Sequence, residues 1–395
     1  MSVAPPGRIA VVLSHPIQYY GPWFRHLAAS GWNLRVFYLW DFGVTRQHDA
    51  GFGQVLAWDI DLLSGYEHEF VPNVSRDPGT HHLRGLDNPD LFRRLQAWRP
   101  DAILVFGYKY LTHLRLLAMP PAPLVFRGDS HLLDAPLRPL KRVLLTAIYS
   151  RFASVTYVGW SNRGYFRALG VPPANLFFAP HCVDSARFTA DESLRAQAAA
   201  LKASLGLTGQ RIVLFAGKLI AKKQPGPLLE AFLETETTGA ALVFVGAGEE
   251  LEPLRTLAAT RPDKTVRFLP FANQSRMPVH YLIADVFALP SRGPEESWGL
   301  AVNEAMHLGV PCLVSDRVGC QRDLVTEGET GWVFSITRPG SLRDALTRAL
   351  DATARDPAGF RRRVSERIAA YTYASASAGL SLAVRHATAR NTRVL

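Results

Sequence analysis

Short apolar segments of strand length alternate with helical patterns along almost the whole chain, and this alternation restricts the possible folds more than any other feature. A strand, a helix and another strand in succession are typical of a parallel sheet with crossover helices. We therefore predict an α/β protein with two doubly wound, Rossmann-like domains that face each other across a cleft. The expected strands lie at residues 9–13, 34–40, 102–106, 123–126, 154–158, 211–215, 241–245, 265–268, 286–289, 312–314 and 331–334.

The alternation is interrupted by a polar, alanine-rich helical segment, which is typical of a connection between domains. A chain of 395 residues also favours two domains over one. We predict an N-terminal domain over residues 1–183, a linker over 184–205 and a C-terminal domain over 206–365. The last segment, 366–395, is predicted to be helical and to pack back on the N-terminal domain.

The formal net charge of +10 suits a nucleic acid, an anionic membrane surface or a phosphorylated substrate. The basic residues are spread over both halves of the chain, which disfavours a nucleic-acid binder. The three cysteines have neither metal-ligand nor redox spacing, so we expect reduced thiols and a cytoplasmic protein. The N-terminus lacks a signal-peptide pattern, and no apolar run has the length of a membrane span.

The most informative stretch follows the apolar segment that ends at Leu289. A turn rich in Ser, Gly and Pro leads through Glu296 to a predicted helix over 299–308, and Glu304 lies inside that helix. Free N–H groups at a helix N-terminus suit an anion. A carboxylate beside an anion site suits hydroxyl groups of the same ligand, and phosphate together with hydroxyls indicates a nucleotide sugar.

Two further loops follow predicted strands of the second half. In the first, Gly217 turns the chain away from the sheet, and Lys218 and Lys223 are placed to neutralise a diphosphate, whereas Lys222 is expected to be solvated. In the second, Gly246 and Gly248 suit phosphate contact and a tight turn required by the backbone about equally.

Taken together, these motifs resemble those of the retaining, nucleotide-sugar-dependent glycosyltransferases of the GT-B fold, known as glycosyltransferase family 4 or glycosyl transferases group 1. That family has two glutamates separated by seven residues, with an aromatic residue and a glycine after the first, as in Glu296, Trp298, Gly299 and Glu304. The glycine–lysine loop and the second glycine loop follow in the family's order, and the resemblance covers roughly residues 206–335. One departure is Lys218, where the family usually has arginine, which binds a phosphate bidentately.

The resemblance implies a role for each matching residue. Lys218 and Lys223 would bind the donor diphosphate and stabilise the leaving group, which makes a metal unnecessary. Glu296 would hold donor-sugar hydroxyls, and Glu304 would accept hydrogen bonds from the ribose. Further donor contacts are expected from Gly217, Gly246, Gly248, Trp298, Gly299 and Leu300, with the backbone amides of the last three near the sugar or distal phosphate.

The first half matches the family less closely, so its candidates are acceptor or sugar contacts. After the first strand these are His15, Gln18 and Tyr19, whereas Tyr20 is expected to pack beneath the first helix. After a later strand, Asp129 and His131 are candidates because the family often has His or Asp near the donor sugar there, and we count His131 among the catalytic residues. Asp129 suits a local helix cap equally well. Weaker candidates for the same cleft are His81, His82, Arg84 and Asp87.

A basic amphipathic helix is predicted over residues 137–152, with Arg138, Lys141 and Arg142 beside its apolar positions. Such a helix can rest on anionic lipid, which would suit a lipid-linked acceptor. The more common arrangement, in which the apolar positions cover the sheet and the charges face water, is favoured here.

These observations lead to one functional hypothesis and two alternatives. The chain is expected to be an enzyme that transfers a sugar from a nucleotide diphosphate sugar to an acceptor hydroxyl with retention, without a cofactor or metal. The acceptor is expected to be a saccharide or lipid-linked saccharide of bacterial surface or exopolysaccharide synthesis, with peripheral membrane contact possible. The alternatives are a non-hydrolysing sugar-nucleotide epimerase and a non-catalytic scaffold that binds nucleotide sugar on the same fold.

Overall fold

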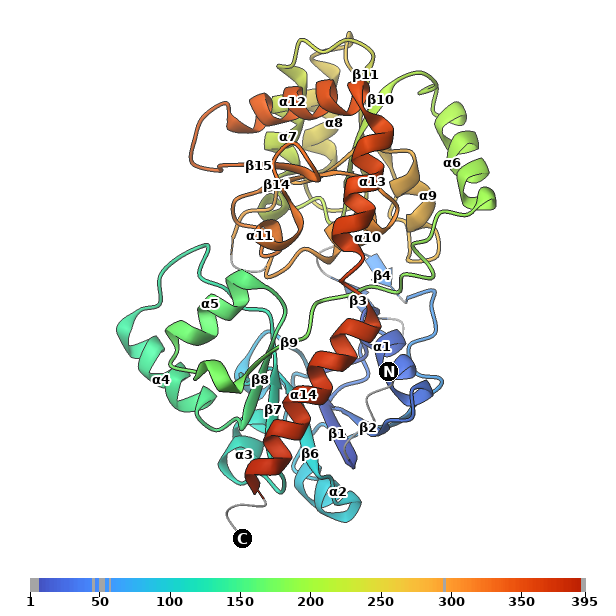
Figure 1. Ribbon diagram of the computed structural model, residues 1–395. Helices are drawn as coiled ribbons and strands as arrows, with labels where there is room; N and C mark the ends of the chain where they lie inside the picture. The colour runs from blue at the N-terminus through green and yellow to red at the C-terminus, as the bar shows by residue number, and fades with distance from the viewer. Residues whose placement is uncertain (1–6, 45–46, 50–53, 57, 294–295, 392–395) are drawn as a thin grey trace. The chain divides into compact units, whose positions relative to one another are not determined.

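The computed structural model describes residues 7–44, 47–49, 54–56, 58–293 and 296–391, and Figure 1 shows its helices and strands. The chain divides into two compact units. The first contains the residues up to Gln47, Leu56–His181 and the residues from Thr372, and the second contains His48–Val55 and Cys182–Tyr371. Each unit is built on a parallel sheet with connecting helices, which confirms the predicted α/β fold class.

The first unit has a seven-stranded sheet in the order β5-β2-β1-β6-β7-β8-β9, with parallel neighbours throughout. Its central strands β1 and β6 carry almost only buried aliphatic residues, as expected for strands covered on both faces. The strands are β1 (Arg8–Leu13), β2 (Asn33–Tyr38), β5 (Glu67–Phe70), β6 (Ala102–Phe106), β7 (Leu124–Arg127), β8 (Ser154–Tyr157) and β9 (Leu176–Phe178).

The last helix of the chain belongs to this first unit and packs against β7, β8 and β9 (Figure 1, red). Ser154 Oγ donates a hydrogen bond to the carbonyl oxygen of Ala383 at 2.8 Å, and Trp23 Nε1 donates one to Ser377 Oγ at 3.1 Å. The helices of the unit are α1 (Gly21–Ala29), α2 (Leu91–Trp98), α3 (Leu111–Ala118), α4 (Pro139–Tyr149), α5 (Trp160–Ala168) and α14 (Tyr373–Asn391), with short turns η1 (Leu83–Gly85) and η2 (Pro173–Asn175).

The second unit has a six-stranded parallel sheet in the order β12-β11-β10-β13-β14-β15. The order reverses between β10 and β13, and the crevice at the carboxyl ends of such strands is the usual ligand site of an open α/β sheet. The strands are β10 (Arg211–Ala216), β11 (Ala240–Val245), β12 (Thr265–Leu269), β13 (Val286–Leu289), β14 (Cys312–Ser315) and β15 (Gly331–Phe334).

The helices of the second unit surround this sheet, and no helix in the described part of the chain is long and apolar enough to cross a membrane. They are α6 (Glu192–Ser204), α7 (Pro225–Leu233), α8 (Leu251–Ala259), α9 (Met277–Leu282), α10 (Leu300–His307), α11 (Gln321–Leu324), α12 (Ser341–Arg355) and α13 (Pro357–Ile368), with the turn η3 (Ala221–Lys223).

The structure differs from the sequence-based expectation at two connections. Residues 184–205, expected to form a linker, belong to the second unit, where α6 packs against α9. Residues 43–87, expected to be largely irregular, contain the edge strand β5 and the short strands β3 (Gln47–Asp49) and β4 (Gln54–Leu56). β5 has only one neighbouring strand and carries partly exposed, charged residues, so the apolar pattern of a central strand is missing from it.

The third difference concerns α4, whose apolar residues were expected to cover the sheet. Leu145 and Tyr149 are buried, and Leu137 and Ile148 pack against the core in part. The side chains of Leu140, Val143 and Leu144 are instead 87%, 70% and 61% exposed. The expected amphipathic helix is present, but only part of its apolar surface faces the protein.

A buried histidine makes the stability of the first unit depend on pH. His113 on α3 is fully buried, and neither ring nitrogen has a hydrogen-bond partner among the described residues. Burial lowers its pKa from 6.5 to about 4, so the unfolded chain binds a proton at pH 5 that the folded chain does not. This contribution to stability is therefore lost as pH falls from about 6.5 towards 4.

Replacement of this histidine by an apolar residue should reduce that pH dependence. Between pH 7 and pH 5 the wild-type protein should lose about 2 kcal/mol of unfolding free energy because of His113. In His113→Leu this loss should disappear, as measured by urea unfolding monitored in the first unit. Partly exposed His131 replaced by Leu is the control, and an equal change in both variants would contradict the assignment.

Candidate active site

The loop after β13 and the start of α10 form the centre of the candidate site in the second unit. Gly299 immediately precedes α10 and has a φ of 94°, a conformation that favours glycine. A Cβ atom at this position would lie 2.9 Å from both Leu289 Cδ2 and Val318 Cγ1. Glycine is thus required for both conformation and space, and it allows the predicted helix to begin directly above the end of the strand.

The structure brings together the two clusters that were singled out in the sequence. Lys223, at the end of η3, forms an ion pair with Glu296, which lies 73 residues later in the chain. Ser291 Oγ donates a hydrogen bond to the same carboxylate oxygen, Oε2, at 2.7 Å. Both charged side chains are mostly buried, with 22% of Lys223 and 13% of Glu296 exposed. The lysine predicted to bind phosphate and the carboxylate predicted to bind hydroxyl groups therefore lie together at the sheet edge.

Glu304 lies deeper, on the second turn of α10, and is 2% exposed. The hydroxyl group of Tyr281 on α9 donates a hydrogen bond to Glu304 Oε2 at 2.7 Å. A buried carboxylate is stable only when hydrogen bonds or charges compensate for its lost hydration, and this bond is one such compensation. The contact also orients the carboxylate within the unit.

The side chain of Trp298 has a structural role. It is buried, its Nε1 donates a hydrogen bond to Asn303 Oδ1 at 2.8 Å, and its ring lies 6.1 Å from that of Tyr371. Its carbonyl oxygen accepts a hydrogen bond from Cys320 N at 2.9 Å. The indole therefore anchors the loop, which leaves the backbone amides near Gly299 and Leu300 as the groups that a ligand could meet.

The loop that carries Lys218 is held by two backbone hydrogen bonds to the neighbouring strand-end loop. Gly217 N donates to Val245 O at 3.0 Å, and Leu219 N donates to Ala247 O at 2.8 Å. Gly217 has a φ of 148°, and nothing lies within 4 Å of a Cβ added there, so conformation and not crowding requires glycine. Lys218 is half-buried between these two fixed residues, and Lys222 is exposed as expected.

Gly246 and Gly248 are explained by backbone packing. A Cβ atom on Gly246 would lie 1.9 Å from Gly217 O, and one on Gly248 would lie 2.3 Å from Leu219 O. Of the two readings that the sequence left open, the structure supports the tight turn. Both glycines act as positioning residues, because they let the second loop press against the residues on either side of Lys218.

In the first unit, His15 lies just after β1 in an aromatic environment. Its Nδ1 is 3.0 Å from Ser14 Oγ, and its ring meets Trp40 and Phe42 edge-on at centroid distances of 6.0 and 5.3 Å. Burial lowers the pKa of His15 to about 4, so the imidazole is neutral near pH 7. It can therefore donate or accept a hydrogen bond but brings no charge.

Gln18, Tyr19 and Tyr20 follow His15 closely in the chain. Gln18 and Tyr19 are partly exposed at the carboxyl edge of the sheet. Tyr20 packs against Phe106 at a centroid distance of 4.7 Å and stacks on Phe24 of α1, as expected for a residue beneath the first helix.

Arg138 is the N-cap of α4, so the structure does not show the helix-cap role, which was one of the two considered for Asp129. Asp129 Oδ2 is 3.2 Å from Nε2 of His181, a buried histidine 52 residues later. Burial lowers the pKa of His181, and Asp129 raises it in part. Arg127, also buried, donates to the carbonyl oxygens of Ala179 and Pro180 at 2.9 and 3.2 Å and thereby ties the loop after β7 to the segment before His181.

His131 makes a local contact, since its Nδ1 accepts a hydrogen bond from Leu133 N at 3.2 Å. The ring is partly exposed in the loop that also carries Asp129. His15, Asp129 and His181 thus lie after three different strands of the same sheet, at its carboxyl edge. Glu295, the neighbour of Glu296 in the sequence, lies outside the described residues.

Sequence reasoning missed the partners that hold these residues in place. They are Tyr281 and Ser291 in the second unit and Arg127 and His181 in the first. Each belongs to an ordinary residue type in an apolar or turn segment, so its role depends on contacts that only the fold creates. The sequence offered one signal, because Arg127 stands directly at the end of an apolar strand. A charged residue at such a position is buried only when it is paired, and Arg127 is buried.

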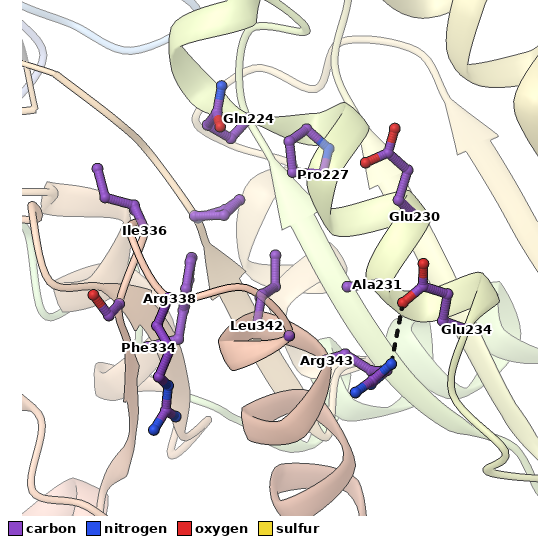
Figure 2. A pocket seen from close by; sticks show the side chains of 13 residues that line it. Gln224, Pro227, Glu230, Ala231, Glu234, Phe334, Ile336, Arg338, Leu342 and Arg343 are labelled. Carbon is purple, nitrogen blue, oxygen red and sulfur yellow. Dashed lines mark ion pairs between the residues drawn. The ribbon is translucent and has the colours of Figure 1, made fainter.

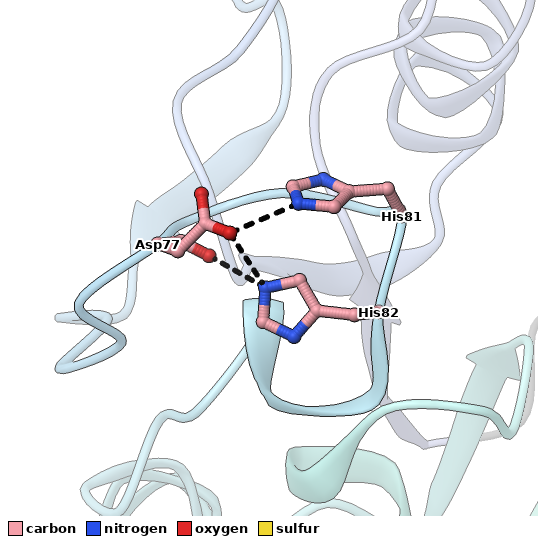
Figure 3. Close-up of side chains that lie close together, drawn as sticks. All are labelled: Asp77, His81 and His82. Carbon is pink, nitrogen blue, oxygen red and sulfur yellow. Dashed lines mark hydrogen bonds and ion pairs between the residues drawn. The ribbon is translucent and has the colours of Figure 1, made fainter.

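Among the described residues, one group could supply several metal ligands, and it lies on the surface of the first unit. His81 Nε2 and His82 Nε2 are 3.1 and 3.2 Å from Asp77 Oδ2, as Figure 3 shows. The three ligand atoms lie within 4.8 Å of one another. Asp87, grouped with these histidines in the sequence, instead forms an ion pair with Arg115.

A cavity of about 250 Å³ lies in the second unit (Figure 2). Its walls include Gln224 and Pro290, which are the sequence neighbours of Lys223 and Ser291. Nη1 of Arg343 on α12 lies 3.5 Å from Oε2 of Glu234, the residue that follows α7. None of the residues that were predicted to bind the donor lines this cavity.

The comparison with known proteins agrees with the fold and with the motifs. The family model of "Glycosyl transferases group 1" matches residues 198–369. The chain is 31% identical over 293 residues to the GDP-mannose-dependent alpha-(1-6)-phosphatidylinositol monomannoside mannosyltransferase of Mycobacterium tuberculosis, covering 70% of this chain and 74% of that protein. The protein of the same name from Mycolicibacterium smegmatis is 30% identical over 242 residues, which are 59% of this chain and 61% of that protein.

A solved structure is similar over almost the entire chain. It is that of the Anabaena protein HepE in complex with UDP, with a TM-score of 0.67, 18% identity and coverage of 99% of this chain and 100% of the other. This likeness shows the fold, and the relatives together with the motif residues show the family. The chain belongs to the glycosyl transferases of group 1 and has their GT-B fold of two Rossmann-like domains.

Proposed function

We propose that the protein transfers a sugar from a nucleotide diphosphate sugar to an acceptor hydroxyl, with retention of the anomeric configuration and without a metal. The observation that carries the proposal is the convergence of Lys223, Ser291 and Glu296 at the start of α10. Fixed cations at the point where a diphosphate leaves stabilise the charge that develops there. Lys218, on the adjoining loop, would add a second cation.

The Lys223–Glu296 ion pair suggests how the donor enters. A diphosphate carries more charge than one carboxylate, so it would draw Lys223 away from Glu296. The released carboxylate would then accept hydrogen bonds from donor-sugar hydroxyls, with Ser291 keeping it in place. Before binding, the pair keeps both charges compensated, which a mostly buried lysine and glutamate require.

The carboxylate of Glu304 is proposed to hold the ribose. Its hydrogen bond from Tyr281 engages Oε2 and orients the group on α10. The proposal thus gives two lysines to the phosphates, one carboxylate to the sugar and one to the ribose. Every part of a nucleotide sugar except its base then has a proposed contact. His131, Asp129 and His15 of the first unit are proposed to contact the sugar or the acceptor.

The acceptor is proposed to be a saccharide or lipid-linked saccharide of bacterial surface polysaccharide synthesis. The relatives in Mycobacterium tuberculosis and Mycolicibacterium smegmatis are named for a glycolipid acceptor, which supports the lipid-linked form. A lipid-linked acceptor lies in a membrane, so peripheral contact with an anionic membrane surface from the cytoplasmic side is part of this proposal.

Removal of the ribose contact should weaken nucleotide binding. Glu304→Gln should lower the affinity for the matching nucleoside diphosphate by roughly 10- to 100-fold, because hydrogen bonds to a charged group contribute about 1.5–3 kcal/mol. Titration calorimetry with GDP, UDP and ADP measures this. Glu230→Gln, an exposed glutamate of α7 in the separate cavity, is the matched control, and equal affinities of all three proteins would rule out the ribose role.

Removal of the sugar contact should separate binding from transfer. Glu296→Gln should keep the affinity for the nucleoside diphosphate but lower kcat/KM for transfer by about 100-fold or more, because it loses an interaction with the reacting sugar. Product formation from GDP-mannose and UDP-glucose with candidate acceptors is the readout. Wild-type turnover in this variant would refute the role of Glu296, and conversion of donor without any acceptor would support the epimerase instead.

The proposed metal independence has a simple test. Transfer rates should be the same with EDTA as with added Mg²⁺ or Mn²⁺, because the lysines supply the positive charge. An Asp77→Asn variant should behave like the wild type in both conditions. A rate that falls with EDTA and returns with the metal would show that the lysines are insufficient.

A further inference from the structure

The solvent face of α4 is apolar, which is the reverse of the usual arrangement for a surface helix. Leu140, Val143, Leu144 and Ala147 follow the spacing i, i+3, i+4 and i+7, so they form one stripe along the helix. All four residues are exposed, and the first three are 87%, 70% and 61% exposed. The helix is anchored by Leu145 and Tyr149 on its opposite side, so the stripe points away from the core of the unit.

Basic residues flank this stripe. Lys141 and Arg142 lie on either side of it, Arg138 precedes the helix, and all three are exposed. Within the described part of the chain, none of the three forms an ion pair. A helix with an apolar stripe between basic residues is complementary to a surface that has anionic groups on the outside and an apolar interior.

The charge pattern extends well beyond the helix. Between Asp134 and Asp184 the sequence contains six lysines and arginines but neither an aspartate nor a glutamate. This interval covers α4, β8, α5 and β9, all within the described residues. A stretch of this length with six basic residues and no carboxylate of its own contributes positive potential, which attracts an anionic surface.

The neighbouring helix α5 adds an interfacial residue. It packs against α4, with the ring centroids of Tyr149 and Phe166 5.3 Å apart, and both helices begin at the carboxyl edge of the sheet (Figure 1). At its first position, Trp160 is 61% exposed, and the guanidinium group of Arg163 lies 5.5 Å from its ring centroid. Tryptophan is favoured where an apolar phase meets water, because its ring has an apolar body and a polar N–H group.

We propose that the outer face of α4, with Leu140, Val143 and Leu144 between Lys141 and Arg142, docks on an anionic phospholipid surface. The leucine and valine side chains would insert among the acyl chains near the headgroups, and the basic residues would pair with the lipid phosphates. Trp160 of α5 would lie at the same boundary. This contact concerns binding to a membrane and does not require that the proposed transfer reaction be correct.

The direct test is flotation with vesicles. The full chain should float with vesicles of phosphatidylglycerol and phosphatidylcholine but not with phosphatidylcholine alone, and high salt should weaken the binding. Leu140→Gln/Val143→Gln/Leu144→Gln should reduce the bound fraction at least tenfold. Lys141→Gln/Arg142→Gln should weaken binding roughly thirtyfold, because each basic residue near an anionic surface contributes about 1 kcal/mol.

Matched controls separate this effect from unfolding and from the donor site. Leu382→Gln replaces an exposed leucine of α14, and Arg195→Gln replaces an exposed arginine of α6, and both should bind vesicles like the wild type. All variants should keep the same melting temperature and the same shift on nucleotide addition. Undiminished flotation of the two α4 variants would overturn the proposal. A second outcome would also overturn it: the wild type forms a dimer and does not bind vesicles, and the triple variant is monomeric. The outer face of α4 would then be a contact between two copies of the chain.

Discussion

The arrangement of the candidate site in the second unit depends on the contacts of the Glu296 carboxylate. This carboxylate accepts hydrogen bonds from Ser291, just after β13, and from Lys223 at the end of η3, so it joins two loops that are distant in sequence. The glycines behind these loops allow the close approach. Gly246 lets the backbone of one loop touch that of Gly217, and Gly299 lets α10 begin directly at the strand end. The ion pair and the close packing of the backbone together fix the positions of the candidate site residues at the edge of the sheet.

The first unit uses a different device at the corresponding edge of its sheet. Arg127 is buried, lies 4.6 Å from the ring centroid of Trp23 and binds the carbonyl oxygens of two consecutive residues before His181. A buried arginine that satisfies backbone carbonyls holds two segments in a fixed relation, because its planar guanidinium group has a rigid set of donors. The Asp129–His181 pair rests on this support. The buried histidine of this pair replaces the lysines that lie at the sheet edge of the second unit.

Much of the fold and of the candidate site in the second unit could be predicted from the sequence, because both depend on local patterns. The alternation of apolar strands and helices predicted the two parallel sheets, and the spacing of Glu296 and Glu304 predicted a strand, loop and helix around them. The pairing of Lys223 with Glu296 and the hydrogen bond from Tyr281 could not be predicted, since these partners lie 73 and 23 residues apart. The exposed stripe of α4 was misjudged for a related reason. Periodicity shows that a helix has an apolar face but not whether the protein covers it.

The return of α14 to the first sheet has a consequence for the order in which the protein can fold during synthesis. Gly379 lies so close to the carbonyl oxygen of Phe178 that a Cβ atom would be 1.8 Å from it, and Ser154 binds a carbonyl group of the same helix. A ribosome makes the whole second unit before it makes this helix. The N-terminal half of the chain must therefore wait, with one face of β7–β9 uncovered, until the last residues emerge, whereas the second unit can already be complete.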